Sequence, residues 1–173
     1  MWRRLLTDVV VELVRFSAGE HQLEGELVYP EEGEIVGAVL LAGPHPLLGG
    51  SRRNNVVRAL GDGLAGFGLA ALRFNYRGVG GSEGPPLDTA THLARFWETS
   101  RVPDEAHHQD DLAAALDFLR SVTGDHLPLA LVGYSYGCSL LPGVASGVAS
   151  ASRASTQRAD ATPLATPESN EQP

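Results

Sequence analysis

The chain has 173 residues, enough for one domain of ordinary size. Its net charge of -8, from 13 basic and 21 acidic residues, argues against a protein that binds the phosphate backbone of nucleic acids. A single cysteine, Cys138, excludes an internal disulfide framework and a cysteine-only zinc cluster, and it agrees with a cytoplasmic protein. The apolar runs are far shorter than the roughly 20 residues that cross a membrane, so no membrane association is expected.

Five short runs rich in apolar and β-branched residues predict strands. They cover residues 9–16, 23–29, 38–42, 69–74 and 127–132. The segment Ser17-Ala18-Gly19-Glu20 is typical of a hairpin turn between the first two. Apolar residues at helical spacing predict a helix from Val56 to Phe67 and a second from Asp104 to Arg120. The order β-β-β-α-β-α-β predicts an α/β protein with a mixed, mostly parallel sheet and flanking helices.

The composition changes sharply near Ser146. Residues 146–173 are rich in Ala, Ser, Thr and Pro, and their only large apolar residues are Val148 and Leu164. Such a segment cannot bury enough apolar surface to offset its conformational entropy. We therefore expect a folded domain over residues 1–145 and a disordered tail over 146–173.

A long connection runs from residue 75 to about residue 103. His92, Phe96 and Trp97 lie in it, and two interpretations of them remain open. Residues 82–103 either form a small cap over a substrate or merely pack the connection against the domain.

The last predicted strand is followed by Gly133-Tyr134-Ser135-Tyr136-Gly137, a G-x-S-x-G pattern. In this pattern a nucleophilic serine occupies a sharp strand-to-helix turn with a strained backbone, and small flanking residues avoid collisions. The segment Gly80-Gly81-Ser82-Glu83-Gly84 matches as well, but neither a strand nor a helix flanks it. The context therefore assigns Ser82 to a loop and favours Ser135 as the nucleophile. The alternative for Ser135 is an ordinary serine in a βα turn.

The loop Gly43–Gly50 follows the third strand, where serine hydrolases place their second oxyanion donor. The prolines at its second and fourth positions have no N–H to donate, which leaves His45 or Leu47. We favour the backbone N–H groups of Leu47 and Tyr136 as the two oxyanion donors. The alternative is a rigid turn that holds no ligand.

Four blocks taken together resemble the α/β-hydrolase superfamily, and within it a group of small, lid-poor hydrolases. They are the Gly43–Gly50 loop, the segment from Arg73 to Gly84, the helix from Asp110 to Arg120 and the turn at Ser135. The similarity runs from about residue 10 to about residue 145. It implies a serine nucleophile, an acyl-enzyme intermediate and hydrolysis of an ester, thioester or amide in a small-molecule acyl substrate.

The family places an acid and then a histidine after the serine. Here all six histidines precede Ser135, and the residues after it contain one aspartate, Asp160, and two glutamates, all in the tail. We call the strand-to-helix turn at Ser135 the elbow. We therefore expect an α/β-hydrolase-like fold truncated after the strand and the helix that flank the elbow, and a chain that is inactive by itself. His45 is the one candidate for a substitute base, and the alternative is that it shapes its loop.

Three hypotheses for the function stay open. The chain is a serine hydrolase without a complete triad, a non-catalytic module that binds a small molecule or a partner (a pseudoenzyme), or a subunit that receives its acid and histidine from another chain. The truncation leaves the fifth strand as an exposed sheet edge, so a homo-oligomer formed through that edge is expected.

Three further expectations concern single residues. Pro142 falls inside the helix after the elbow and should weaken it. His107 and His108 lie in an acidic helix start and should face solvent. Being adjacent, they do not share a helix face, so they indicate no metal site, and the sequence indicates no cofactor.

Overall fold

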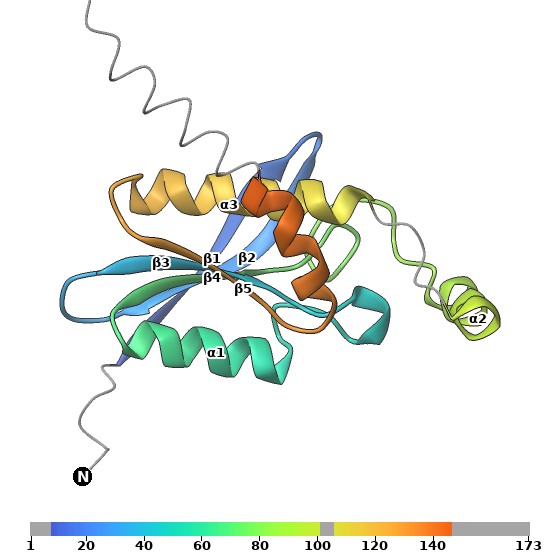
Figure 1. The fold of residues 1–173 in the computed structure, drawn as a ribbon, viewed down its shortest axis with the longest axis horizontal. Coiled ribbons are helices and arrows are strands. Elements are labelled where there is room, and N and C mark those ends of the chain that lie inside the picture. Colours follow the sequence, from blue (N-terminus) through green and yellow to red (C-terminus); the bar gives the residue numbers. More distant parts are fainter. Residues whose placement is uncertain (1–7, 101–105, 147–173) are drawn as a thin grey trace, which may run out of the picture.

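The computed structural model describes residues 8–100 and 106–146 (Figure 1). It contains all the strands predicted from the sequence, and their bounds differ from the prediction only at the first or last residues. They are β1 (Val9–Ala18), β2 (His21–Pro30), β3 (Gly37–Ala42), β4 (Leu69–Phe74) and β5 (Leu129–Gly133). The helices are α1 (Asn55–Gly66), α2 (Thr89–Thr99), α3 (Ala106–Thr123) and a further helix over residues 136–146. Apart from Ser146, the predicted tail lies outside the described residues.

The strands form one mixed sheet in the order β1-β2-β4-β3-β5. β1 and β2 form an antiparallel hairpin that starts with Val9 opposite Pro30, and β2 is also antiparallel to β4. β3 lies between β4 and β5 and runs parallel to both. β5 is therefore at one end of the sheet in the described part of the chain, which confirms the predicted edge.

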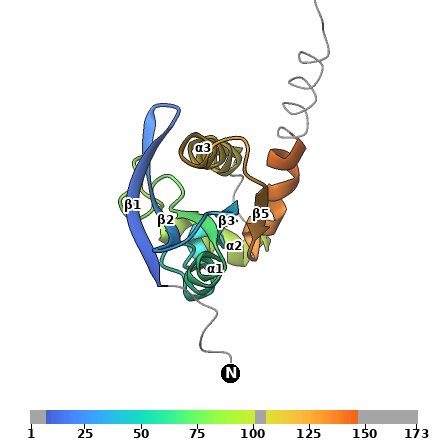
Figure 2. The same ribbon diagram turned by 90° about the vertical axis from the view of Figure 1, so that its left-hand side faces the viewer.

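Figure 2 shows α3 on one face of the sheet and α1 on the other. All residues of β3 are buried, because a central strand of such a sheet is covered on both faces. The larger part of the core lies under α3. It contains the α3 residues Leu112, Leu116 and Leu119 together with Phe16, Leu23, Leu40, Leu72 and Phe74. No helix in the described ranges is long and apolar enough to span a membrane.

The helix over residues 136–146 continues through Pro142, so the proline lies inside it as predicted and does not end it. Leu140 and Val144, one turn apart, both bury their side chains in the core next to α3. A proline at position 142 removes one backbone hydrogen bond, and it is exposed. The packing of the apolar face on either side of it stabilises the helix in spite of that loss.

A buried ion pair fixes α3 to the loop after β4. The Asp111 carboxylate is fully buried and accepts hydrogen bonds from the Arg77 backbone N–H at 2.8 Å, from its Nε at 2.8 Å and from its Nη2 at 2.6 Å. A buried carboxylate is tolerated only with such partners. The first turns of α3 are thereby held close to the carboxyl end of β4.

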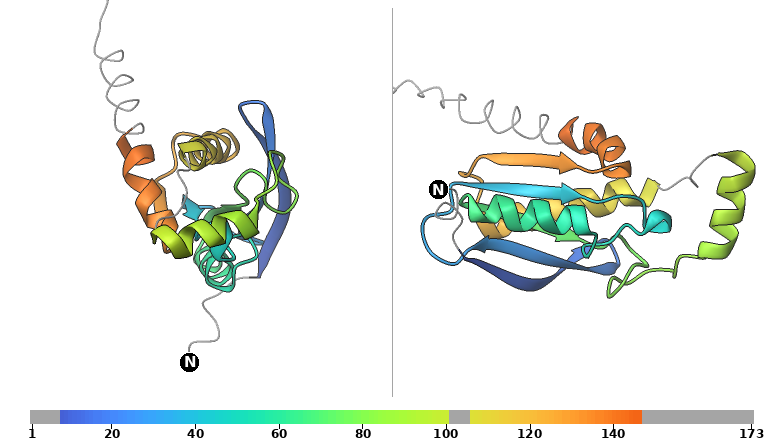
Figure 3. Two further views of the ribbon diagram at one scale, coloured as in Figure 1. Left: turned by 90° about the vertical axis from the view of Figure 1, so that its right-hand side faces the viewer. Right: turned by 90° about the horizontal axis from the view of Figure 1, so that it is seen from below.

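Helix α2 lies within the long connection for which no helix was predicted. The Asp88 side chain accepts a hydrogen bond from the Thr91 N–H at 3.1 Å and caps the helix start. Figure 3 shows α2 beyond the carboxyl ends of the parallel strands, set off from the sheet. None of its residues is fully buried, and Trp97 is 78% exposed. The helix makes its contacts at the short 3-10 helix η1 (Pro46–Leu48).

Candidate active site

The chain reverses direction between the end of β5 and the helix that begins at residue 136. At this point Ser135 has a φ angle of +56°, in the left-handed region, and its side chain is exposed. That conformation costs an L-residue of this kind roughly 1–2 kcal/mol. Hydrogen bonds hold it in place: the Tyr134 N–H donates to the Ala42 carbonyl at 2.9 Å, and the Cys138 N–H donates to the Ser135 carbonyl at 3.0 Å. The strained turn that the sequence pattern predicts is present.

The two glycines of the pattern are each pressed against backbone atoms. A Cβ on Gly133 would lie 2.6 Å from the Cys138 nitrogen, and a Cβ on Gly137 would lie 2.1 Å from the Ala42 oxygen. Backbone atoms cannot rotate away as the end of a side chain can. Any side chain at either position would therefore force β5, the following helix and the end of β3 apart.

The Gly43–Gly50 loop connects β3 to the region before α1 and contains η1. His45 stands just before η1, and its Nδ1 accepts a hydrogen bond from the Leu47 N–H at 3.0 Å. The side chain is 1% exposed. Its position agrees with the loop-shaping role considered for it, and the Leu47 N–H, which we expected to serve as an oxyanion donor, is directed at His45 in this structure.

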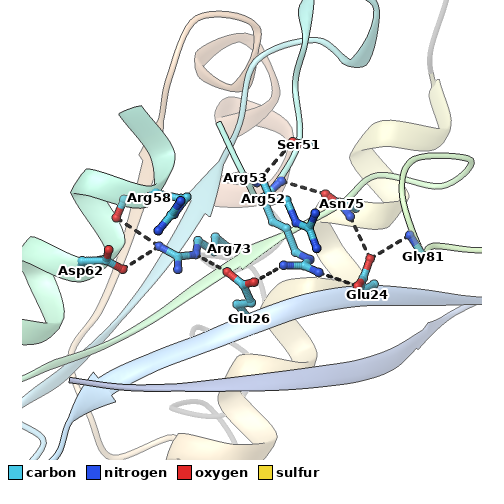
Figure 4. Close-up of polar contacts among 10 residues, drawn as sticks. All are labelled: Glu24, Glu26, Ser51, Arg52, Arg53, Arg58, Asp62, Arg73, Asn75 and Gly81. Atoms are coloured by element: carbon cyan, nitrogen blue, oxygen red, sulfur yellow. Dashed lines mark hydrogen bonds and ion pairs between the residues drawn. The ribbon is translucent and has the colours of Figure 1, made fainter. Parts of the chain in front are cut away.

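Arg52 anchors the far end of this loop to the sheet (Figure 4). Its guanidinium group forms ion pairs with two carboxylates of β2, with Glu24 at 2.6 Å and with Glu26. Its backbone N–H donates to Asn75 Oδ1 at 2.7 Å. The loop is thus held from one side by β2 and from the other by the residue that follows β4.

The same ion-pair network reaches α1. Arg73 of β4 pairs with Glu26 at 2.7 Å and with Asp62 of α1 at 2.8 Å, and it also donates to the Arg58 carbonyl at 3.1 Å. Both Arg52 and Arg73 are buried, at 5% and 2% exposed. Their shared partner, Glu26, therefore ties the loop, two strands and a helix into one unit.

Glu24 links β2 to the loop after β4. The hydrogen bond from Arg52 holds the pKa of the Glu24 carboxyl below its ordinary value. Partial burial opposes this shift, while the Gly81 N–H at 2.8 Å and the Asn75 amide at 3.0 Å act in the same direction as Arg52. The carboxyl is therefore ionised at neutral pH and accepts hydrogen bonds from three residues, Arg52 before α1 and Asn75 and Gly81 in the loop after β4.

Four aromatic and imidazole rings from separate segments meet behind the elbow. They belong to His45, Tyr76, His108 and Tyr136. The centroids of His45 and Tyr136 lie 4.7 Å apart, and those of Tyr76 and His108 lie 4.5 Å apart. His108 Nδ1 is 3.3 Å from the Tyr136 hydroxyl oxygen. Residues that precede the elbow in the sequence thus support the residue that directly follows Ser135.

The expectation that both histidines of α3 face solvent is half wrong. His107 is exposed, but His108 is 6% exposed and belongs to the ring cluster. Neighbouring residues on a helix point about 100° apart, so one of an adjacent pair can face the core while the other faces water. The sequence carried a weak signal for this, because His108 stands three and four residues before Asp111 and Leu112, which are both buried.

The other singled-out residues lie apart from the elbow. Ser82 is a buried loop residue, as predicted: its hydroxyl donates to the Asn75 carbonyl at 2.8 Å and accepts from the Glu24 N–H at 2.9 Å. His92 and Phe96 are partly buried on α2. Within residues 8–100 and 106–146, no group of three His, Cys, Asp or Glu side chains is arranged to hold a metal ion.

Comparison with known proteins decides the fold. No family model matches the sequence. A serine hydrolase homologue from Coxiella burnetii is 29% identical with a TM-score of 0.59, over 81% of this chain and 58% of that structure. A serine hydrolase without a lid from Xanthomonas campestris is 25% identical with a TM-score of 0.57, over 82% of this chain and 57% of that structure. The fold of this chain is that of the α/β hydrolases.

The α/β-hydrolase fold confirms the superfamily resemblance and the fold class predicted from the sequence. An uncharacterized protein of Rickettsia prowazekii (strain Madrid E) is 28% identical over 124 residues, which are 72% of this chain and 45% of that protein. The chain therefore spans about half the length of the proteins that it matches.

Proposed function

We propose that this chain carries the nucleophile and the oxyanion hole of a serine hydrolase that acts on a small-molecule acyl substrate. The observation that carries the proposal is the turn at Ser135. An exposed serine with φ of +56° stands between a strand and a helix of an α/β-hydrolase fold, and Gly133 and Gly137 allow the two elements to approach each other. A strained, exposed serine at this place is the geometry that nucleophilic attack requires.

In the proposed reaction, the Ser135 Oγ attacks the acyl carbonyl carbon and the carbonyl oxygen becomes an oxyanion. The Tyr136 N–H, at the start of the helix over residues 136–146, stabilises that charge together with the positive end of the helix dipole. The alcohol, thiol or amine leaves with the proton that the Ser135 hydroxyl loses, and an acyl-enzyme ester remains on Ser135. Water then hydrolyses this ester and releases the acid.

The second donor must come from the Gly43–Gly50 loop. The Leu47 N–H is the candidate, and it becomes available to an oxyanion when it exchanges its hydrogen bond with His45 for one with the substrate. The ion pairs of Arg52 with Glu24 and Glu26 hold the end of this loop on the sheet, so the exchange of this hydrogen bond does not require the whole loop to move.

We further propose that the chain is a weak catalyst by itself. A neutral imidazole has one acceptor nitrogen, and in His45 this nitrogen, Nδ1, already accepts from Leu47, so the proton is on Nε2. Nδ1 is released only when the Leu47 N–H moves to the oxyanion, and that oxyanion forms as the proton of Ser135 leaves, so the ring is not available to take this proton. Without a base, the oxyanion hole and substrate binding leave a residual acceleration of about 10³–10⁴-fold over water. Hydrolysis of an activated aryl ester should therefore stay near background, whereas a turnover of ~1 s⁻¹ that disappears in Ser135→Ala would contradict this part of the proposal.

Labelling with a fluorophosphonate, followed by peptide mass spectrometry, tests the nucleophile directly. We expect slow labelling at Ser135 that is abolished in Ser135→Ala and retained in Ser139→Ala. Ser139 is a matched control because it is exposed on the same helix, with its hydroxyl donating to the Tyr136 carbonyl at 2.7 Å. Absence of label at Ser135 would instead favour the non-catalytic binding module.

The compartment proposed for this activity is the cytoplasm. Cys138 is a free, exposed thiol, which suits a reducing environment. The net charge of -8 supports a small-molecule substrate over a nucleic acid.

A further inference from the structure

Tyr136 takes part in the proposed site through its backbone and is held there through its side chain. Its backbone N–H is the oxyanion donor next to Ser135, and its side chain is held by two imidazole rings. The His108 Nδ1 lies 3.3 Å from the Tyr136 hydroxyl oxygen, and the His45 ring packs against the Tyr136 ring at 76° with the centroids 4.7 Å apart. We infer that His108 is a positioning residue for the oxyanion hole, because its hydrogen bond to the Tyr136 side chain fixes the direction of the Tyr136 N–H. This inference rests on the proposed function.

The location of Tyr136 makes its orientation sensitive to such a contact. It is the first residue of its helix, and the N–H groups of a first helical turn point out of the helix end instead of into the hydrogen-bond ladder. The direction of such a group is therefore set by whatever holds its residue. A displacement of about 1 Å in a catalytic group can cost as much as 100-fold in rate.

His108 itself is rigidly placed. It is buried in α3, with the Tyr76 ring 4.5 Å away between centroids. One turn further along the helix, the ion pair between Asp111 and Arg77 fixes α3 to the loop after β4. Through its hydrogen bond to the Tyr136 hydroxyl, His108 thus fixes the place of Tyr136 relative to the folded core.

The same ring cluster reaches the other expected donor. His45 packs against both Tyr136 and His108, at 4.7 and 5.6 Å between centroids, and accepts a hydrogen bond from the Leu47 N–H. The contact between the two histidine rings therefore fixes the two proposed oxyanion donors relative to each other. His108 of α3 holds Tyr136, and His45 holds Leu47 in the Gly43–Gly50 loop.

The test compares four variants of the full chain. His108→Phe keeps a ring in the cluster but removes the nitrogen, and His108→Asn restores a polar atom close to the position of Nδ1. Tyr136→Phe removes a single oxygen atom and is the variant least able to disturb folding. His107→Phe is the matched control on the exposed neighbour. Two quantities are measured: the second-order rate constant for fluorophosphonate labelling of Ser135, and the amide ¹H–¹⁵N resonance of Tyr136. Both are measured well below the melting temperature of each variant.

We expect His108→Phe and Tyr136→Phe each to slow labelling about tenfold, and the double variant to be no slower than either, because both remove the same bond. His108→Asn should recover most of the rate, and His107→Phe should match the unaltered protein. The Tyr136 amide resonance should move in His108→Phe and stay in place in His107→Phe.

Two results would overturn the inference: labelling rates that are unchanged in His108→Phe and Tyr136→Phe, or effects that add fully in the double variant. If Ser135 is not labelled in any protein, the proposed function fails and the amide resonance decides the inference alone. A Tyr136 resonance that does not move in His108→Phe then refutes the positioning role, and one that moves there but not in His107→Phe supports it.

Discussion

Gly137→Ala is the substitution whose effect the structure defines most sharply. An added Cβ would lie 2.1 Å from the Ala42 oxygen, 2.6 Å from the Ala42 carbonyl carbon and 2.8 Å from the Gly43 oxygen. All three are backbone atoms at the end of β3, so relief requires the helix after the elbow to move away from the sheet by about 1 Å. Overpacking of a rigid site costs about 1–3 kcal/mol, and contact with backbone places this case at about 3 kcal/mol. For a domain of this size, that lowers the melting temperature by roughly 10 °C.

The matched control is Gly63→Ala. Gly63 lies within α1, and a Cβ there has no atom within 4 Å. Replacing a helical glycine by alanine in open space should stabilise the protein by about 1 kcal/mol. The same chemical change is therefore expected to lower the melting temperature at position 137 and to raise it at position 63. Thermal and urea unfolding followed by far-UV circular dichroism measures both. A Gly137→Ala protein that melts within ~2 °C of the unaltered chain would show that the elbow does not pack on β3 as described.

Three further predictions concern charge and the sheet edge. Asp111→Ala leaves the guanidinium of Arg77 without its partner and should cost about 3–5 kcal/mol in urea unfolding, and a loss under ~1 kcal/mol would contradict this. The pKa of the Glu24 carboxyl is lowered in the folded state, so its stabilising contribution is complete above the ordinary pKa of a glutamate and is lost as the pH falls through the folded pKa. In thermal melts recorded at a series of pH values, Glu24→Gln should lack this loss of stability at acid pH. A pH dependence equal to that of the unaltered protein would count against the Arg52 contact. The exposed edge at β5 should lead to concentration-dependent self-association in light scattering, which a monodisperse monomer at high concentration would refute.

The parts of this fold that could be predicted from the sequence are those determined by residues close together in the chain. β3 is a continuous apolar run because it is covered on both faces, β4 is one apart from Arg73, and the bounds of both were predicted almost without error. The turn at Ser135 depends on glycines two positions away on either side. Helix α2 shows the opposite case: its large apolar residues, Leu93, Phe96 and Trp97, are confined to about one turn in a long connection, and the helix stands apart from the sheet with no fully buried residue.

The supports of the site were missed for a different physical reason. Arg52, Glu26 and Arg73 come from three segments, and they meet only because β2 pairs with β4 while the chain between them forms β3 and α1. His108 likewise reaches Tyr136 through the packing of α3 on the sheet. For the arginines and glutamates no local pattern distinguishes a side chain that will be buried in this way from one that faces water, because their pairing depends on the strand order, and for His108 the helical spacing to Leu112 gave only a weak signal. A serine elbow can therefore be located from its own few residues, whereas the groups that orient its oxyanion donors become visible only once the sheet is assembled.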